Sequence, residues 1–161
     1  FIPIIDMHYV NERKGDGDKM LIFCSLVQYI TKVANWISLK YPQFKVVEYT
    51  GDATKDQLND ADIIVATTGK AATGLDIKGL ITCYNTVSMR TPILTSQALG
   101  RLRKIDNRKL QYIDRCDCNI GAQRRHAQDR KMLLRTMAAK FTEYHGMYKQ
   151  SPTISGSPYE I

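Results

Sequence analysis

Short apolar runs that alternate with helix-like segments constrain the fold more than any other feature of this sequence. The runs cover residues 20–24, 45–49, 62–66, 80–85 and 110–114, and polar or turn-forming residues bound them. Continuous apolar runs of this length are typical of strands that are buried on both faces. Because strands that alternate with helices favour a parallel sheet covered on both sides, we predict an α/β domain with three layers.

Helix starts are predicted after two of these strands. Ser25, with Gln28 three residues later, has the pattern of a capping box, and apolar residues at helical spacing follow it up to Pro42. Thr91 precedes Pro92, and proline suits the first position of a helix. We therefore expect one helix to start at Ser25 and another at Pro92.

The two ends of the chain differ from its middle. We predict a lead-in segment over residues 1–19, one α/β domain over residues 20–150, and a flexible tail over residues 151–161, which are rich in Ser, Pro and Gly. A basic helix over about residues 121–144 is expected to close the domain. Its apolar side is predicted to pack on the core through Leu133, Met137, Phe141 and Tyr144.

Composition excludes a membrane-embedded protein. The hydrophobic fraction of 43% and the charged fraction of 24% are ordinary for a soluble globular domain. No apolar stretch approaches the ~20 residues of a membrane-spanning helix, and the start at Phe1 does not resemble a signal peptide. We therefore expect no membrane partner, a cytoplasmic location, and a chain that is one part of a longer protein.

The cysteines do not form a recognisable metal site. Cys24 and Cys83 lie in predicted strands, whereas Cys116 and Cys118 are separated by one residue, which is tighter than the usual spacing of metal ligands. The only further ligand nearby is His126. Four reduced cytosolic thiols are the favoured interpretation, and metal binding is the weaker alternative.

Positive charge gathers in the C-terminal third of the chain. The net charge is +7, and residues 97–149 hold 13 Lys or Arg against 5 Asp or Glu, so the whole excess lies there. Such a concentration suits a polyanion, either nucleic acid or nucleotide phosphates. A solvated basic helix without a partner explains the charge equally well.

The segment after the third predicted strand carries residues suited to phosphate. Thr67, Thr68 and the backbone amides that follow are able to hold a phosphate at a helix start, with Lys70 close behind. Gly74 permits a tight turn, and Asp76 suits a ribose hydroxyl or a neighbouring arginine. Each also has an ordinary explanation: Thr67 as a helix cap, Lys70 as a solvated charge and Asp76 as a turn residue.

A second segment combines Gln97 with three cations, Arg101, Arg103 and Lys104. Cations at the end of a helix stabilise its dipole, which is the ordinary explanation. The functional explanation is a set of guanidinium groups aimed at phosphoryl oxygens.

Taken in order, four segments resemble motifs of the second RecA-like domain of superfamily 2 helicases. Residues 21–25 resemble motif IV, residues 49–51 the phosphate-contacting loop after it, residues 66–76 motif V, and residues 97–103 the Gln-x-x-Gly-Arg pattern of motif VI. The likeness extends over about residues 20–115. Gln in place of His in motif VI, together with the basic closing helix, resembles the branch that holds the UvsW-type phage branch-migration helicases, XPB and the restriction translocases.

The resemblance implies a RecA-like fold and one half of an ATP-driven motor. In that family a first lobe holds most of the ATP and Mg²⁺ contacts, and ATP closes the cleft between the two lobes. The implied partners are DNA, single-stranded or branched, with RNA as an open alternative, and the N-terminal RecA-like lobe of the same protein. The implied location is the cytoplasm of a bacterium or of a phage-infected cell.

Site residues follow from the matched motifs. The resemblance gives the catalytic role at the γ-phosphate to Arg101 and Arg103, with Gln97 organising that site. Further ATP contacts are implied for Gly74, Asp76 and Lys104. Nucleic-acid contacts are implied for Ser25, Thr50, Gly51, Thr67, Thr68 and Lys70.

Three departures from the family pattern bear on these expectations. The sequence has no Walker A motif and no Asp-Glu box, so we expect no ATP hydrolysis by this chain alone. The second arginine of motif VI is expected at Lys104, and Arg103 is favoured for its role because a guanidinium binds phosphate in two places. The stretch between Gly51 and Asp62, where most of the family has a further helix, is very short, so the lobe looks trimmed.

Two rival functions stay open. A basic α/β domain can act as a catalytically silent nucleic-acid-binding or docking module, and a Walker A motif upstream would decide for the motor. A nucleotide-binding enzyme for a small molecule is the weaker rival, because it leaves residues 97–103 unexplained and the sequence offers no nucleophile and base in its place.

Overall fold

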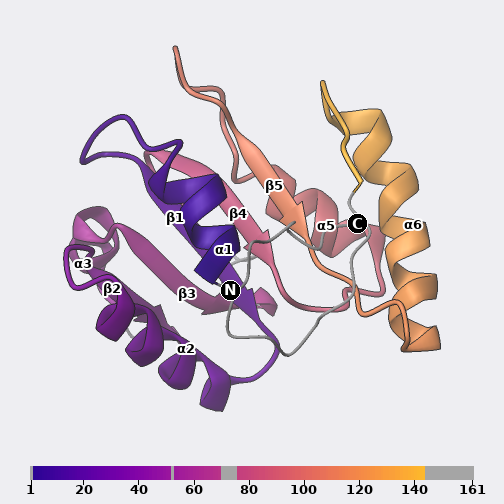
Figure 1. Cartoon of the computed structure of the whole chain (residues 1–161), viewed down its shortest axis with the longest axis horizontal. Coiled ribbons are helices and arrows are strands. Elements are labelled where there is room, and N and C mark those ends of the chain that lie inside the picture. Colours follow the sequence, from indigo (N-terminus) through magenta and orange to yellow (C-terminus); the bar gives the residue numbers. More distant parts are fainter. Residues whose placement is uncertain (1, 52, 70–75, 144–161) are drawn as a thin grey trace.

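A central sheet of five parallel strands forms the middle layer of the molecule (Figure 1). The computed structural model describes residues 2–51, 53–69 and 76–143. The sheet has the order β2-β3-β1-β4-β5, and every neighbouring pair is parallel. The predicted strands and parallel sheet are therefore confirmed. The strands are β1 (Lys19–Cys24), β2 (Val46–Tyr49), β3 (Ile63–Thr67), β4 (Leu80–Asn85) and β5 (Gln111–Asp114).

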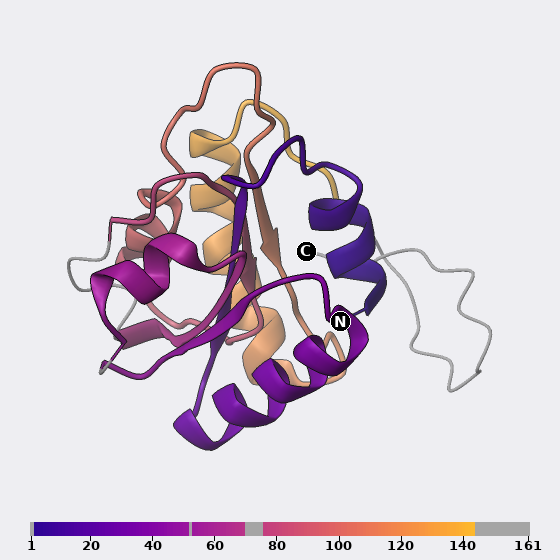
Figure 2. The same ribbon diagram turned by 90° about the vertical axis from the view of Figure 1, so that its left-hand side faces the viewer.

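Helices cover both faces of the sheet. One face carries α1 (Ile2–Ile5), the π-helix η1 (Asp6–Val10) and α2 (Val27–Lys40). The other carries α3 (Lys55–Asp60) and α5 (Pro92–Leu99), and α6 (Gly121–Met137) packs beside α5. Figure 2 shows α1 and α3 on opposite sides of the strands. This arrangement confirms the three-layer α/β fold.

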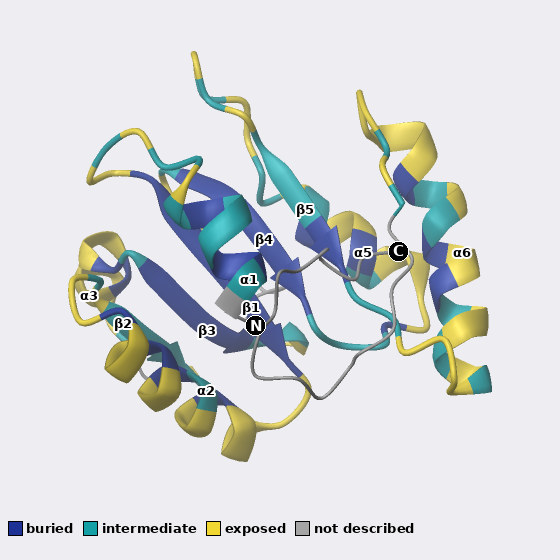
Figure 3. Ribbon diagram, in the orientation of Figure 1, coloured by how far each residue is buried: buried dark blue, intermediate teal, exposed yellow. Residues whose placement is uncertain are grey.

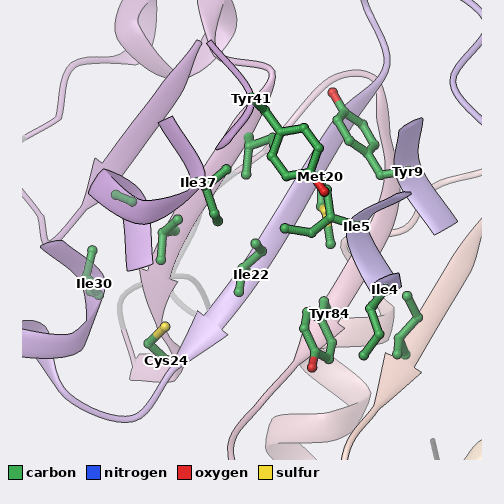
Figure 4. Packing of buried hydrophobic residues seen from close by; sticks show 14 of the residues in the cluster. Ile4, Ile5, Tyr9, Met20, Ile22, Cys24, Ile30, Ile37, Tyr41 and Tyr84 are labelled. Carbon is green, nitrogen blue, oxygen red and sulfur yellow. The ribbon is translucent and has the colours of Figure 1, made fainter. Parts of the chain in front are cut away.

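Alternation of side chains along β1 divides the core into two halves. Met20, Ile22 and Cys24 face α1 and α2, whereas Leu21 and Phe23 face α3 and α5. All five are buried, as expected when both faces of a parallel sheet are covered (Figure 3). Figure 4 shows the first half, where side chains from α1, α2 and the central strands meet.

The start of α2 differs from the prediction. The residue before the helix is Leu26, which has extended backbone and makes no capping hydrogen bond from its side chain, so the capping box predicted at Ser25 is wrong. A capping box is present instead at α3. There the hydroxyl of Thr54 accepts from the backbone N–H of Gln57 (3.3 Å), and the Gln57 side chain accepts from the backbone N–H of Thr54 (2.8 Å). The helix predicted after Pro92, by contrast, begins there as expected.

Helix α3 occupies the polar stretch where the sequence indicated no helix. Its six residues are held on the sheet by Leu58, which is 6% exposed, and by Ala61 just after its end. One buried leucine among polar residues is too weak a periodic signal to predict a helix of this length.

Residues 2–10, expected as part of a lead-in segment, contribute to the core. Ile5 and Tyr9 are completely buried. The Tyr9 hydroxyl lies within hydrogen-bond distance of the backbone oxygens of Asp18 (2.8 Å) and Asp62 (3.0 Å), next to the amino ends of β1 and β3. This segment is therefore packed on the sheet, while the division of the whole chain into three parts stays a prediction.

Helix α6 is shorter than predicted and buries a different face. It ends at Met137, which is 51% exposed, and the predicted apolar side is therefore wrong; Tyr144 lies outside the described residues. The physical reason is an ion pair between Arg130 and Asp114 that fixes the rotation of the helix. The buried residues of α6 are Ala127, Arg130 and Leu134.

Candidate functional site

The residues predicted to contact nucleic acid gather at the carboxyl ends of β1, β2 and β3. The strand register pairs Cys24 with Thr67, so Ser25 and Thr68, which follow them, leave the sheet side by side. Thr50 leaves β2 at the same edge, because β2 pairs with β3 in parallel. The structure thus brings together hydroxyl groups from three loops that are far apart in the sequence.

The turn after β2 requires a glycine. Gly51 is exposed and has a φ of 125°, a backbone conformation that other residues rarely adopt. Ser25 is exposed, and Thr50, Thr67 and Thr68 are half-buried. Hydroxyl groups at one edge suit contacts to phosphate oxygens, which give affinity without base specificity. Lys70, the remaining residue of this predicted set, lies outside the described residues.

A buried polar network lies beneath the same edge at β4 and β5. Asp114, the last residue of β5, accepts from Asn85 Nδ2 (2.6 Å) and from Arg130 Nε (2.8 Å). Arg130 Nη1 also donates to the backbone oxygen of Met89 (2.8 Å). Both members of the ion pair are at most 2% exposed. The network therefore joins the ends of two strands, the loop before α5 and the helix α6.

Burial dominates the electrostatics of this network. It raises the pKa of the Asp114 carboxyl above its ordinary value, and the neighbouring Arg130 guanidinium opposes the rise. Burial also raises the pKa of the Tyr112 hydroxyl, two residues earlier on the same strand. We predicted no role for Asp114 from the sequence, although an acidic residue at the end of an apolar strand, with an arginine in the next helix, is the pattern by which it could have been found.

The residues predicted to contact ATP lie at the opposite edge of the sheet. Asp76 comes shortly before the start of β4, and α5 runs back from the carboxyl edge, so Arg101, Arg103 and Lys104 after it reach the amino edge. These residues therefore lie away from the hydroxyl groups at the carboxyl ends of β1, β2 and β3. Gly74, of the same predicted set, lies outside the described residues.

Asp76 and Arg103 face each other at this amino edge. Asp76 Oδ1 lies 3.6 Å from Arg103 Nη1, and the side chains are 51% and 71% exposed. The structure thus brings together the aspartate of one predicted motif and an arginine of the other. Lys104 and Gln97 are exposed, and Arg101 is half-buried. The catalytic and ATP-binding roles of these residues stay predictions.

Cationic side chains follow one another closely after α5. Arg101 is half-buried, Arg103 and Lys104 are exposed, and guanidinium and ammonium groups of this kind donate hydrogen bonds to anions in general. Among the described residues there is no group of three or more His, Cys, Asp or Glu able to hold a metal ion.

Ion pairs and close backbone packing hold the amino edge together. Arg108 Nε donates to both carboxylate oxygens of Asp18 (2.8 and 2.9 Å). Burial raises the pKa of Asp18, but hydrogen bonds from Arg108 and from the backbone of Lys14 bring it below its ordinary value. Gly79, at φ 82°, lies so close to the backbone oxygen of Gly17 that an added Cβ would come within 1.8 Å of it. These contacts could not be predicted from the sequence, because the residues that make them are far apart in the chain.

The four cysteines are free thiols, two of them buried in strands. Cys24 and Cys83 are buried free thiols, and burial raises the pKa of both. Burial, with Cys118 beside it, raises the pKa of Cys116 to about 11. None of these three thiols, at Cys24, Cys83 and Cys116, therefore provides a reactive thiolate near neutral pH. None of the described helices is long and apolar enough to span a membrane.

Comparison with solved structures agrees with this architecture. The chain is similar to the C-terminal part of the Fun30 ATPase domain, with a TM-score of 0.53 and 15% identity over 69% of this chain and 37% of that one. It is also similar to domain 2 of the DEAD-box helicase Mss116p, solved with an RNA duplex, with a TM-score of 0.49 and 14% identity over 60% of this chain and 41% of that one.

No family model and no curated protein matches the sequence. The chain spans less than half of each of the two solved chains. At this identity the likeness shows the fold alone, and that fold is the RecA-like α/β domain predicted from the sequence.

Proposed function

We propose that this chain is the second motor lobe of an ATP-dependent helicase or translocase that moves on nucleic acid. One observation carries the proposal: Asp76 and Arg103, both candidates for ATP contact, lie together at one edge of the sheet, and the candidate strand-contacting hydroxyls lie at the other. A motor lobe needs both surfaces on one rigid body, since closure on the nucleotide must displace the strand.

On the nucleotide side, Arg101 and Arg103 would meet the γ-phosphate that the first lobe presents, and Gln97 would orient them. Two guanidinium groups stabilise the charge that develops on phosphoryl transfer. The pair with Asp76 is exposed, so water screens it and an incoming phosphate displaces it at little cost. Lys104, one residue further on, adds a point charge to the same loop.

On the strand side, the hydroxyls of Ser25, Thr50 and Thr67 would contact the sugar-phosphate backbone, with the open backbone at Gly51. The connection that leaves β3 at Thr68 returns to β4 next to the nucleotide residues. The two groups are thus joined along the chain between Thr68 and Asp76, so closure at one edge would have a covalent link to the other.

The finer placement follows the sequence motifs. Gln97 and the basic helix α6 support the branch of UvsW-type branch-migration helicases, XPB and restriction translocases, with single-stranded or branched DNA as substrate and a role in recombination or repair. We place the protein in the cytoplasm of a bacterium or a phage-infected cell. In this proposal the lobe extends through residue 150 and, because residues 2–10 pack on its core, begins before residue 20.

The test is ATP turnover by the full-length protein that carries both lobes. Arg101→Ala should lower DNA-stimulated turnover by about a thousandfold or more, since arginines in this position supply effects of that size in phosphoryl transfer. Lys78→Gln is a matched control, because it removes an exposed charge near the same edge. If Arg101→Ala turns over ATP as fast as the Lys78→Gln control, the assignment is contradicted.

A catalytically silent nucleic-acid-binding or docking module is the second candidate. The observation that favours it is the Asp76–Arg103 contact, which occupies one of the two arginines assigned to phosphate. A silent module would bind DNA with the same affinity whether or not nucleotide is present. The full-length protein would then show no ATP turnover, even without a substitution.

A further inference from the structure

Nine of the ten arginines of this chain fall into two groups. Five of them pair with carboxylates: Arg13, Arg103, Arg108, Arg130 and Arg135. Within the described part of the chain, four others make no ion pair and no hydrogen bond from their side chains: Arg90, Arg115, Arg124 and Arg125. An arginine without a carboxylate partner is available to an external anion.

The four unpaired arginines belong to three segments that meet at the carboxyl edge of the sheet. Arg90 ends the loop between β4 and α5, Arg115 follows β5, and the other two lie in the first turns of α6. Two contacts hold these segments side by side: Ser88 Oγ lies 3.0 Å from His126 Nδ1, and the backbone N–H of Arg115 donates to Asn85 (3.1 Å). We call these four residues the arginine patch.

The Asn85–Asp114–Arg130 network supports the arginine patch from below. Arg130 Nη1 donates to the backbone oxygen of Met89, the residue before Arg90, and Asp114 immediately precedes Arg115. The buried arginine thus fixes the backbone from which two of the unpaired ones project. A surface built on buried ion pairs holds its cations in place before a ligand arrives.

We propose that the arginine patch is a second phosphate-binding surface, which continues the path of a nucleic-acid strand beyond the hydroxyls at β1, β2 and β3. The patch lies over β4 and β5, which complete the same edge. The inference rests on the strand-contacting part of the proposed function and does not depend on ATP hydrolysis.

The dimensions of the edge fit one backbone. Five adjacent strands at the usual spacing give an edge of roughly 19 Å, which is long enough for several successive phosphates of one strand. The hydroxyl loops would bind the phosphates at the β2 end and the arginine patch those at the β5 end. Arginines add what the hydroxyls lack, a charge that releases counterions and so makes binding salt-dependent.

The experiment measures binding of the 161-residue chain to a fluorescein-labelled single-stranded DNA of mixed sequence, by anisotropy over a series of salt concentrations and without nucleotide. The variant Arg124→Gln/Arg125→Gln removes two exposed charges of the arginine patch. The matched control, Lys32→Gln/Lys40→Gln, removes two exposed charges from α2. Arg124→Lys/Arg125→Lys keeps the charge at the patch, and thermal melts check that all variants fold.

Each phosphate contact on a single strand contributes about 0.7 to the slope of log affinity against log salt. The Arg124→Gln/Arg125→Gln variant should therefore lose about 1.4 of this slope and bind about 25-fold more weakly at about 0.1 M salt. The lysine control should change affinity less than twofold, and the Arg→Lys variant should keep most of it.

Three results would overturn the inference. The first is an unchanged slope in the glutamine variant. The second is an equal loss in the α2 control, which would show only the effect of net charge. The third is competition by polyglutamate as strong as that by unlabelled DNA, which would point to an acidic protein partner. Because ATP turnover plays no part in this assay, its failure is distinct from failure of the motor assignment.

Discussion

Replacing Arg130 with methionine should strongly destabilise the fold. The side chain is 1% exposed, pairs with Asp114 at 2.8 Å and also donates to the backbone of Met89. Arg130→Met leaves Asp114 as a buried carboxylate with Asn85 as its remaining side-chain donor. Breaking a buried pair in this way costs about 3–5 kcal/mol, because one charge stays buried without its partner.

The loss should depend on pH. Burial raises the pKa of Asp114 in the folded protein, and removing the arginine takes away the main effect that opposes the rise. The folded variant then binds more protons than the unfolded chain between the ordinary and the raised pKa, so its free energy of unfolding falls as the pH rises through that window. The deficit relative to the unsubstituted chain should be largest at neutral pH and smaller in acid, where Asp114 is protonated.

Urea unfolding at several pH values measures this deficit. Adding Asp114→Asn to Arg130→Met removes the stranded charge and should recover a large part of the loss at neutral pH. Arg124→Met, on the exposed side of the same helix, is the matched control and should cost less than about 0.5 kcal/mol. A deficit that is below about 1 kcal/mol, or that does not vary with pH, would refute the reasoning.

Three further changes have defined outcomes. Gly79→Ala should lower the free energy of unfolding by at least about 2 kcal/mol, because the position has a φ of 82° and its Cβ would overlap a backbone oxygen; a loss near zero in urea unfolding would contradict this. Thr54→Ala removes the capping box of α3 and should cost about 1 kcal/mol, measured in the same way, with no loss counting against the cap. Asp76→Asn breaks an exposed pair with Arg103 and should change stability by less than about 0.5 kcal/mol, so that any larger change would indicate a structural role for the pair.

The strands of this fold could be predicted because a parallel sheet buries both faces. Met20 to Cys24 are apolar without a break for this reason, and such a run is visible in the sequence alone. Helix starts depend on backbone geometry that short patterns do not determine. Ser25 and Thr54 have the same type of pattern, yet only Thr54 caps a helix, since the chain stays extended through Leu26.

The sequence motifs nominated the members of the candidate site, but they did not predict how these residues are arranged on the sheet. The order of the motifs brought Thr67, Asp76 and Arg103 to attention, but only the topology separates the first from the other two, at opposite edges of the sheet. The buried pair of Arg130 and Asp114 joins residues whose partnership depends on how α6 turns against β5. The spacing of apolar residues predicts the rotation of a helix only when apolar residues face the core. In α6 a charged residue, Arg130, faces the core, so the spacing did not predict how the helix is turned.

Coupling between the two edges is the central claim, and the affinity of the full-length protein for single-stranded DNA, measured with and without a non-hydrolysable ATP analogue, tests it most directly. The analogue should change this affinity by about tenfold, within the usual range for coupled sites, and Arg101→Ala should abolish the change while leaving nucleotide-free binding in place. An affinity that is the same with and without the analogue in the unsubstituted protein would contradict a motor lobe and leave a silent binding module.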